Sequence, residues 1–121
     1  MANLLTPNER TDTLPALGAT GWRAVEGRDA IRKVWKFRSF SEAWGFLSRT
    51  ALMAERLNHH PEWRNTYNVV DVTLTTHDAN GLTGLDVKLA EAMDRFGAGA
   101  EVQADHSAPI QSLCEARASG R

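Results

Sequence analysis

Hydrophobic residues recur along this chain at two spacings, which predict helices in some segments and strands in others. Two stretches place them at steps of three and four residues, as on one face of an α-helix. The first comprises Phe40, Ala43, Trp44, Leu47, Ala51, Ala54 and Leu57, and the second comprises Leu85, Leu89, Ala92, Met93 and Phe96. We therefore expect a central helix that runs to about Asn58 and a further helix that ends near Phe96.

Three short motifs predict where helices begin. In residues 6–9, 39–42 and 83–86, a Thr or Ser precedes an acidic residue by three positions, which is the spacing of a capping box. Pro15, Gly18 and Gly21 should keep the first helix short. Pro61 should close the central helix region, because the residue before a proline is disfavoured in the α conformation.

Two segments alternate hydrophobic and polar residues and predict β-hairpins. The first pairs residues 22–25 with residues 30–38, although Lys33 and Val34 blur its alternation. The second spans residues 63–76 and turns around Tyr67 and Asn68. The order helix, hairpin, helix, hairpin, helix predicts an α+β fold, in which helices cover one face of a four-stranded antiparallel sheet in two layers.

Length and composition predict a single domain followed by a tail. With 121 residues, the chain has the size of one ordinary domain, which we assign to residues 1–96. Residues 97–121 begin with Gly-Ala-Gly-Ala and hold almost no large hydrophobic side chain, so we expect a flexible tail. The tail contains the only cysteine, Cys114, which has no partner for an intrachain disulfide.

Charge and hydropathy exclude several classes of function. The chain has 14 Lys and Arg against 15 Asp and Glu, a net charge of −1, so no broad basic surface is available for nucleic acid. No hydrophobic stretch approaches the roughly 20 residues of a membrane span. The first residues resemble neither a secretory signal nor a transit peptide, which favours a cytoplasmic location.

The central helix carries hydrophobic residues outside its main stripe. Phe46, Leu52 and Met53 lie off that stripe. They could form a second hydrophobic strip for another subunit, or they could belong to the core.

Histidines at the ends of elements are the sharpest chemical feature. His59 and His60 end the central helix region, and His77 follows the second hairpin. Imidazole can donate and accept protons near neutral pH, which an elimination of water requires without a nucleophile or an organic cofactor. Alternatively, these are ordinary helix-end and strand-end residues. A zinc site is disfavoured, because the adjacent His59 and His60 point in different directions.

Three further side chains have a structural as well as a functional interpretation. Trp63 could stack on a planar heterocycle or simply cover the core. Asp86 is explained by helix capping alone. Glu55 lies one helical turn before His59 and could support its charged form, or it could be a solvated surface residue.

Taken together, these residues resemble the pterin-4a-carbinolamine dehydratase family, whose animal members are also known as the dimerisation cofactor of a homeodomain transcription factor. The resemblance covers nearly everything up to about Phe96. It is carried by Gly21-Trp22, Glu26-Gly27-Arg28-Asp29-Ala30-Ile31, Ala43-Trp44-Gly45-Phe46, Ala54-Glu55-Arg56-Leu57-Asn58-His59-His60-Pro61-Glu62-Trp63, Asn65-Thr66-Tyr67-Asn68, Thr75-Thr76-His77-Asp78 and Gly81-Leu82-Thr83 with Asp86.

The resemblance implies a lyase that dehydrates 4a-hydroxytetrahydropterin to quinonoid dihydropterin and water, without a metal or organic cofactor. By position, His59 and His77 would do the acid and base work, His60 would hold the pterin, and Asp86 would be the accompanying carboxylate. The same comparison places Trp63 in the pocket and backbone groups near Thr75 and Thr76 at the polar edge of the pterin. Leu85 departs from the pattern, because some members carry a basic residue there.

The resemblance also implies partners. Family members form homodimers or homotetramers, through sheet edges and in some cases through helices. Exposed edge strands independently favour such pairing. Two alternatives to pterin recycling remain open: a dimeric protein-interaction module that acts on a partner, as the animal relatives do, and a dehydratase for a different carbinolamine.

Overall fold

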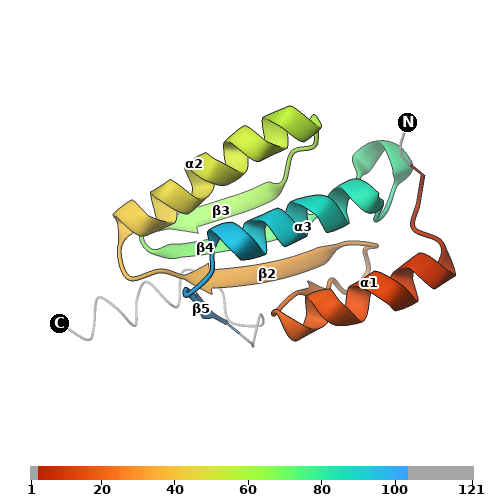
Figure 1. Cartoon of the computed structure of the whole chain (residues 1–121), viewed down its shortest axis with the longest axis horizontal. Coiled ribbons are helices and arrows are strands. Elements are labelled where there is room, and N and C mark those ends of the chain that lie inside the picture. Colours follow the sequence, from red (N-terminus) through yellow and green to blue (C-terminus); the bar gives the residue numbers. More distant parts are fainter. Residues whose placement is uncertain (1–2, 104–121) are drawn as a thin grey trace.

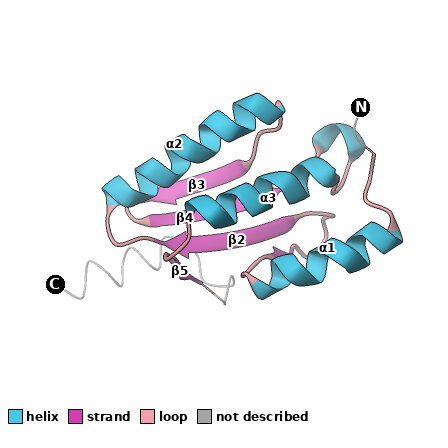
Figure 2. Cartoon of the chain, in the orientation of Figure 1, coloured by secondary structure: helices cyan, strands magenta, loops and turns pink. Residues whose placement is uncertain are grey.

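The computed structural model describes residues 3–103, which form helices and a mostly antiparallel sheet in two layers. Figures 1 and 2 show the helices on one face of the sheet. This confirms the predicted α+β class. The elements are α1 (Pro7–Ala19), β1 (Arg23–Ala24), β2 (Ile31–Lys36), α2 (Phe40–Leu57), β3 (Glu62–Thr66), β4 (Val69–Leu74), the 3₁₀ helix η1 (His77–Ala79), α3 (Gly84–Phe96) and β5 (Glu101–Val102).

The sheet has the strand order β1-β2-β4-β3, and each neighbouring pair is antiparallel. Both predicted hairpins are present: β1 pairs with β2, and β3 pairs with β4 across a turn at Tyr67 and Asn68. In the centre of the sheet, Trp35 lies opposite Val70 and Lys33 opposite Val72. The antiparallel order brings the end of β4 and the start of β3 to the same end of the sheet.

The predicted helix starts are confirmed at α1 and α3, where both halves of a capping box form. At α2 only half of the predicted box is present. The Ser39 hydroxyl accepts from the Glu42 N–H, but the Glu42 carboxylate binds Arg38 instead of the Ser39 N–H. In α1 the helix continues through Pro15 and ends at Ala19, so Pro15 does not terminate it.

The buried face of α2 differs from the predicted stripe. Phe46 is fully buried and contacts Trp35 and Phe37 with its ring, so it belongs to the core. Trp44, which the stripe placed inward, is 58% exposed and stacks on the equally exposed Phe40. The buried face of α2 is rotated relative to the predicted stripe, because α2 carries hydrophobic residues on two sides and only one of these sides meets the sheet.

The blurred alternation around Lys33 has a structural cause. Lys33 lies on the core side of β2 and is buried, and its Nζ lies 2.7 Å from Oδ1 of Asp94 on α3. The same carboxylate accepts hydrogen bonds from the indole of Trp22 and the hydroxyl of Thr20. A buried cation is thus paired and hydrogen-bonded, as burial requires. On the opposite face, Val34 packs with Val69.

The first part of the expected tail is ordered against the sheet. Residues 97–103 include β5, which pairs with β2, so the flexible tail does not begin at Gly97 as expected. Residues 104–121, including Cys114, lie outside the described residues. In the described part of the chain, none of the helices has the length and hydropathy needed to cross a bilayer.

Candidate active site

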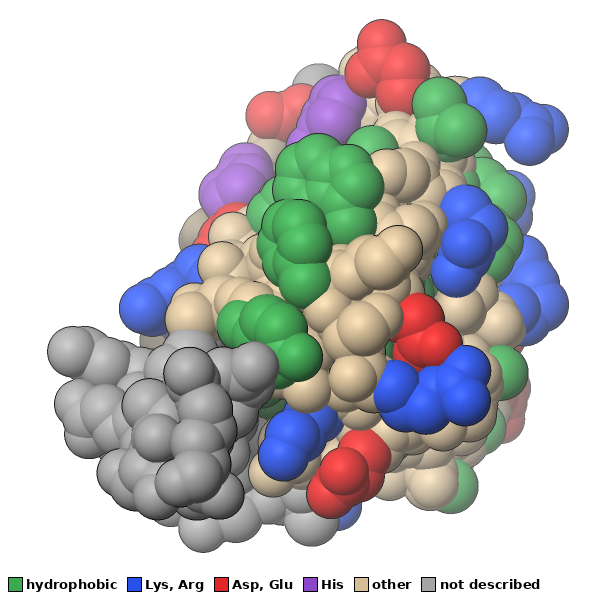
Figure 3. All heavy atoms as spheres, turned by 90° about the vertical axis from the view of Figure 1, so that its left-hand side faces the viewer, with side chains coloured by type: hydrophobic (Ala, Val, Ile, Leu, Met, Phe, Trp, Pro, Cys, Tyr) green, Lys and Arg blue, Asp and Glu red, His purple; other side chains and the backbone are tan. Residues whose placement is uncertain are grey.

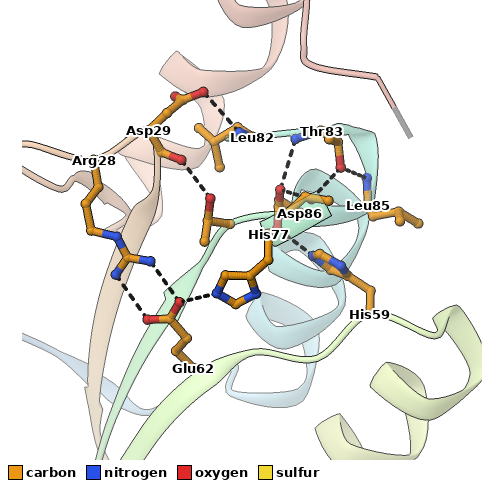
Figure 4. A network of polar contacts seen from close by, with 11 residues as sticks. Arg28, Asp29, His59, Glu62, His77, Leu82, Thr83, Leu85 and Asp86 are labelled. Carbon is orange, nitrogen blue, oxygen red and sulfur yellow. Dashed lines mark hydrogen bonds and ion pairs between the residues drawn. The ribbon is translucent and has the colours of Figure 1, made fainter. Parts of the chain in front are cut away.

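Three element ends meet at one end of the fold and carry most of the candidate residues. His59 follows the end of α2, where Asn58 takes a left-handed conformation (φ 49°) and the His59 N–H binds the carbonyl of Ala54. His77 opens η1 shortly after β4, and Asp86 lies in the first turn of α3. Figure 4 shows these side chains in the same region, where His59 contacts Asp86 and His77 contacts Glu62 in neighbouring but separate sets of polar contacts, here called the network. The folding of these three ends therefore brings together residues that are far apart in sequence.

His59 and Asp86 form the buried part of the network. The distance from His59 Nε2 to Asp86 Oδ1 is 2.5 Å, and both side chains are almost completely removed from solvent. Asp86 thus does more than cap a helix. Because one ring nitrogen of His59 is held by the carboxylate, Nδ1 is the nitrogen left for other chemistry.

The other oxygen of Asp86 connects the site to the fold. Oδ2 accepts from the Thr83 N–H at 2.9 Å, which completes the capping box, and from the Thr76 hydroxyl at 2.7 Å. The backbone N–H and carbonyl of Thr76 are both hydrogen-bonded to Gly81. The polar groups of Thr76 therefore hold the loop between β4 and α3, although we expected its backbone to face a ligand.

Thr75 is anchored to the turn between β1 and β2. Its hydroxyl donates to the carbonyl of Asp29 at 2.9 Å. The Asp29 carboxylate accepts two hydrogen bonds from Arg10 and one from the Leu82 N–H. The hydrogen bonds from Arg10 hold the pKa of Asp29 below its ordinary value, against the opposing effect of burial. This ionised carboxylate joins α1, the turn and the loop before α3.

His77 lies on the exposed part of the network. Its Nε2 is 3.0 Å from Oε2 of Glu62, the first residue of β3, and Arg28 donates to both oxygens of that carboxylate at 3.0 and 2.8 Å. The hydrogen bonds from Arg28 lower the pKa of Glu62, and His77 contributes in the same direction. Glu62 is therefore ionised at neutral pH. The turn before β2 and the start of β3 thus hold the His77 ring.

His60 points to a different partner than His59. Its Nε2 lies 3.3 Å from Oε1 of Glu55, and both side chains are well exposed. Of the two interpretations given to Glu55, the structure shows the exposed surface residue: its carboxylate contacts His60 and not His59, because the left-handed turn at Asn58 carries His59 away from the surface of α2. His60 is thus available to solvent and to a ligand.

Trp63 combines the two interpretations given to it. It is half-buried and packs against the core, and it also borders a hollow of about 400 Å³ together with Glu62. A larger hollow, of about 920 Å³, lies at the opposite end of the sheet and is lined by none of the candidate site residues. The smaller hollow adjoins the site through Glu62 and Trp63, and none of the three candidate histidines lines it. In residues 3–103 no group of three His, Cys, Asp or Glu side chains is arranged to hold a metal ion.

Arg28 and Glu62 are the network residues to which sequence reasoning gave no role. Both lie in stretches that carry the family resemblance, and Glu62 directly follows His59-His60-Pro61. Their contact joins positions 34 residues apart and depends on the way the β1–β2 turn approaches β3. An acidic residue inside a histidine motif is the signal that could have identified Glu62.

Comparisons with known proteins identify the family of this chain. Residues 3–96 match the family model described as pterin 4 alpha carbinolamine dehydratase. A protein of Bradyrhizobium sp., provisionally named a pterin-4-alpha-carbinolamine dehydratase, is 55% identical over 98 residues, covering 81% of this chain and 97% of the relative. One from Dinoroseobacter shibae with the same provisional name is 53% identical over 96 residues, covering 79% of this chain and 99% of the relative.

A solved structure supports the same assignment. It is described as a transcriptional coactivator/pterin dehydratase from Brucella melitensis and is 51% identical in sequence. The match covers 79% of this chain and 100% of the Brucella chain, with a TM-score of 0.74. With the family model and the relatives, it places this chain in the pterin-4-alpha-carbinolamine dehydratase family.

Proposed function

We propose that this protein dehydrates 4a-hydroxytetrahydropterin to quinonoid dihydropterin and water by acid–base catalysis with histidines. The reaction would take place in the cytoplasm and would serve the recycling of an oxidised pterin. The observation that carries the proposal is the shared arrangement of His59 and His77. Each has Nε2 against a carboxylate, His59 against Asp86 and His77 against Glu62, in two separate sets of polar contacts at the same end of the fold (Figure 4). Each ring is thereby oriented by a third group, as a general acid or base should be.

The reaction needs two proton transfers and no electron transfer. The C4a–O bond breaks, the hydroxyl takes up a proton and leaves as water, and a ring nitrogen of the pterin loses a proton. A histidine that gives a proton and one that receives a proton are sufficient for this balance. We assign these tasks to His59 and His77, and Asp86 acts through His59 by fixing its ring.

Binding of the pterin falls to the groups around the two histidines. His60 is exposed beside Glu55 and can hold the substrate by hydrogen bonding. Trp63 offers the edge of a half-buried ring next to the hollow, where a flat bicyclic ligand can pack. We assign the polar edge of the pterin to the backbone near Thr75, because that of Thr76 is already hydrogen-bonded.

The test is turnover of 4a-hydroxytetrahydropterin, generated in situ, by the wild-type protein and by His59→Ala and His77→Ala. Each substitution should lower turnover by about 10²-fold. Near-normal turnover in both variants would contradict the proposed acid and base. The folded state of each variant is checked by circular dichroism.

A second proposal is that the protein forms homo-oligomers and uses a hydrophobic surface of α2 to do so. Phe40, Trp44 and Leu52 are all exposed on this helix, and Figure 3 shows hydrophobic side chains gathered on one face of the molecule, with histidines at its margin. Exposed aromatic side chains that stack on one another commonly mark a contact surface. The same surface would serve a coactivator role, which is part of the description of the Brucella protein.

A further inference from the structure

We propose that Glu62, held by Arg28, is a positioning residue that makes Nδ1 of His77 the nitrogen that exchanges a proton with the substrate. The inference rests on the proposed dehydratase function. It adds roles for Glu62 and Arg28 in that function and assigns a tautomer to His77.

The contacts of Glu62 leave little freedom to its carboxylate. Arg28 Nη1 donates to Oε1 at 3.0 Å and Nη2 donates to Oε2 at 2.8 Å, a two-pronged arrangement that fixes the plane of the carboxylate. Oε2 also lies 3.0 Å from Nε2 of His77. Figure 4 shows the three side chains in a row, with Glu62 between Arg28 and His77.

An ionised carboxylate can only accept hydrogen bonds, so the ring nitrogen that faces it must carry a hydrogen. Glu62 is ionised at neutral pH, because Arg28 lowers its pKa. Nε2 of His77 is therefore a donor whether the ring is neutral or charged. In the neutral ring the lone pair lies on Nδ1, and the proton is gained and lost there.

Exposure makes this hydrogen bond important for His77. The His77 side chain is 70% exposed, so packing alone does not orient the ring. His59, by contrast, is buried and is fixed both by packing and by Asp86. A base that is not held by packing depends on a hydrogen-bonded partner for its orientation. Arg28, which lies in the turn before β2, holds the Glu62 carboxylate in position for this contact.

The direct test is the tautomer of His77, measured by ¹⁵N NMR of the imidazole at a pH where the ring is neutral. In the wild type we expect the Nε2–H form. Oε2 of Glu62 accepts from Arg28 and also faces Nε2 of His77, so Arg28 lies opposite both positions of the side chain. In Glu62→Gln the amide can therefore turn its NH₂ group toward Nε2, which then becomes an acceptor, and the Nδ1–H form should grow from its low wild-type population. Glu42→Gln is the control, because Glu42 also accepts two hydrogen bonds from an arginine, here both from Arg38 to Oε2, and its hydrogen bonds in the described residues involve no histidine.

Kinetics supply the second readout. Glu62→Gln should lower kcat by about tenfold with KM changed less than about twofold, because the ring of His77 is misoriented while the substitution changes neither the shape of the side chain nor the residues assigned to binding, His60 and Trp63. Arg28→Gln keeps the carboxylate, so the tautomer should persist while kcat falls by less than in Glu62→Gln. Glu42→Gln should match the wild type in both measurements.

Three results would overturn the proposal. One is a wild-type His77 that is mainly in the Nδ1–H form, and another is a Glu62→Gln variant that retains the Nε2–H form. The third is a changed tautomer with unchanged kcat. If the wild type shows no dehydratase activity, the proposed function fails, and the NMR measurement still supports or overturns the positioning of His77 by Glu62.

Discussion

The imidazole of His59 and the carboxylate of Asp86 meet at 2.5 Å inside the protein, although the two residues are 27 positions apart. The contact joins the end of α2 to the first turn of α3. Asp86 also accepts from the Thr83 N–H and the Thr76 hydroxyl, so one carboxylate caps a helix, anchors a loop and orients a histidine. The stability of the fold and the geometry of the site are therefore linked through a single side chain.

This link predicts a large loss of stability when Asp86 is removed. Asp86→Ala leaves the buried Thr76 hydroxyl, the Thr83 N–H and His59 without their acceptor, and should lower the free energy of unfolding by about 2–4 kcal/mol. Urea denaturation measures it. Glu9→Ala, at the same position of the exposed capping box of α1, should cost clearly less. Equal losses in the two variants would contradict the account.

The two proposed proton-transfer histidines should differ in their effect on stability. His77→Ala removes an exposed ring and should leave the free energy of unfolding within about 0.5 kcal/mol of the wild type. His59→Ala removes a buried ring and strands Asp86, and should cost about 1–3 kcal/mol. Both values come from urea denaturation. A large loss in His77→Ala, or none in His59→Ala, would show that the burial of one ring and the exposure of the other are wrongly assigned.

His60 should affect substrate binding more than chemistry. Its ring is exposed and contacts the carboxylate of Glu55, which is also exposed, so no buried carboxylate orients it for proton transfer. His60→Ala should chiefly raise the apparent KM for the pterin, and Glu55→Gln should have a smaller effect in the same direction. Steady-state kinetics separates the two constants. A loss confined to kcat would show that the roles of the histidines are misassigned.

The ion pair between Arg10 and Asp29 predicts a specific pH dependence of stability. The pKa of Asp29 is lower in the folded chain than its ordinary value of 3.8, chiefly through the hydrogen bonds from Arg10. Such a group stabilises the fold above the unfolded pKa, and this contribution is lost as the pH falls through the folded pKa. Arg10→Gln should therefore be less stable than the wild type at pH 7, and the difference should shrink below about pH 4.

The measurement for Arg10→Gln is urea denaturation of both proteins across that pH range. Glu62 and Glu42, whose pKa values are also lowered by arginine partners, are present in both proteins, so their contributions cancel in the difference. A difference that stays constant or grows on acidification would contradict this interpretation of the Asp29 pair.

The exposed aromatic pair on α2 should control oligomeric state. Phe40→Ser combined with Trp44→Ser removes the stacked rings and should reduce the mass observed by analytical ultracentrifugation, while dehydratase activity is retained. Leu4→Ser, at an exposed hydrophobic residue outside α2, is the control and should leave the mass unchanged. An unchanged mass in the double variant would show that this surface of α2 does not form the contact between subunits.

Local patterns were sufficient to predict the order of the three α-helices and two hairpins, because caps and alternation depend on neighbouring residues, but they did not predict η1 or β5. They could not decide between two arrangements that fit the same pattern of hydrophobic residues equally well. The spacing on α2 could not decide whether Phe46 or Trp44 faces the sheet, and the alternation of β2 could not reveal that Lys33 is buried against Asp94. Which of these residues is buried depends on the helix or strand that packs against the segment, and that neighbour is distant in sequence.

The candidate site shows the same division. The histidines and Asp86 were identified from sequence, and the resemblance supplied their grouping. The contact of Glu62 with Arg28 and His77 depends on how a turn, a strand start and a 3₁₀ helix meet, which no local spacing encodes. Sequence also could not decide between the two interpretations of Glu55, because the left-handed turn at Asn58 determines that His60, and not His59, lies beside it.

The most direct test of the central claim is the rate at which quinonoid dihydropterin appears from 4a-hydroxytetrahydropterin, followed by stopped-flow absorbance at increasing protein concentration. We predict that the observed rate rises above the uncatalysed rate in proportion to the concentration of wild-type protein. We predict also that a variant lacking both His59 and His77 leaves it at the uncatalysed value. A wild-type protein that leaves the rate unchanged would contradict the account.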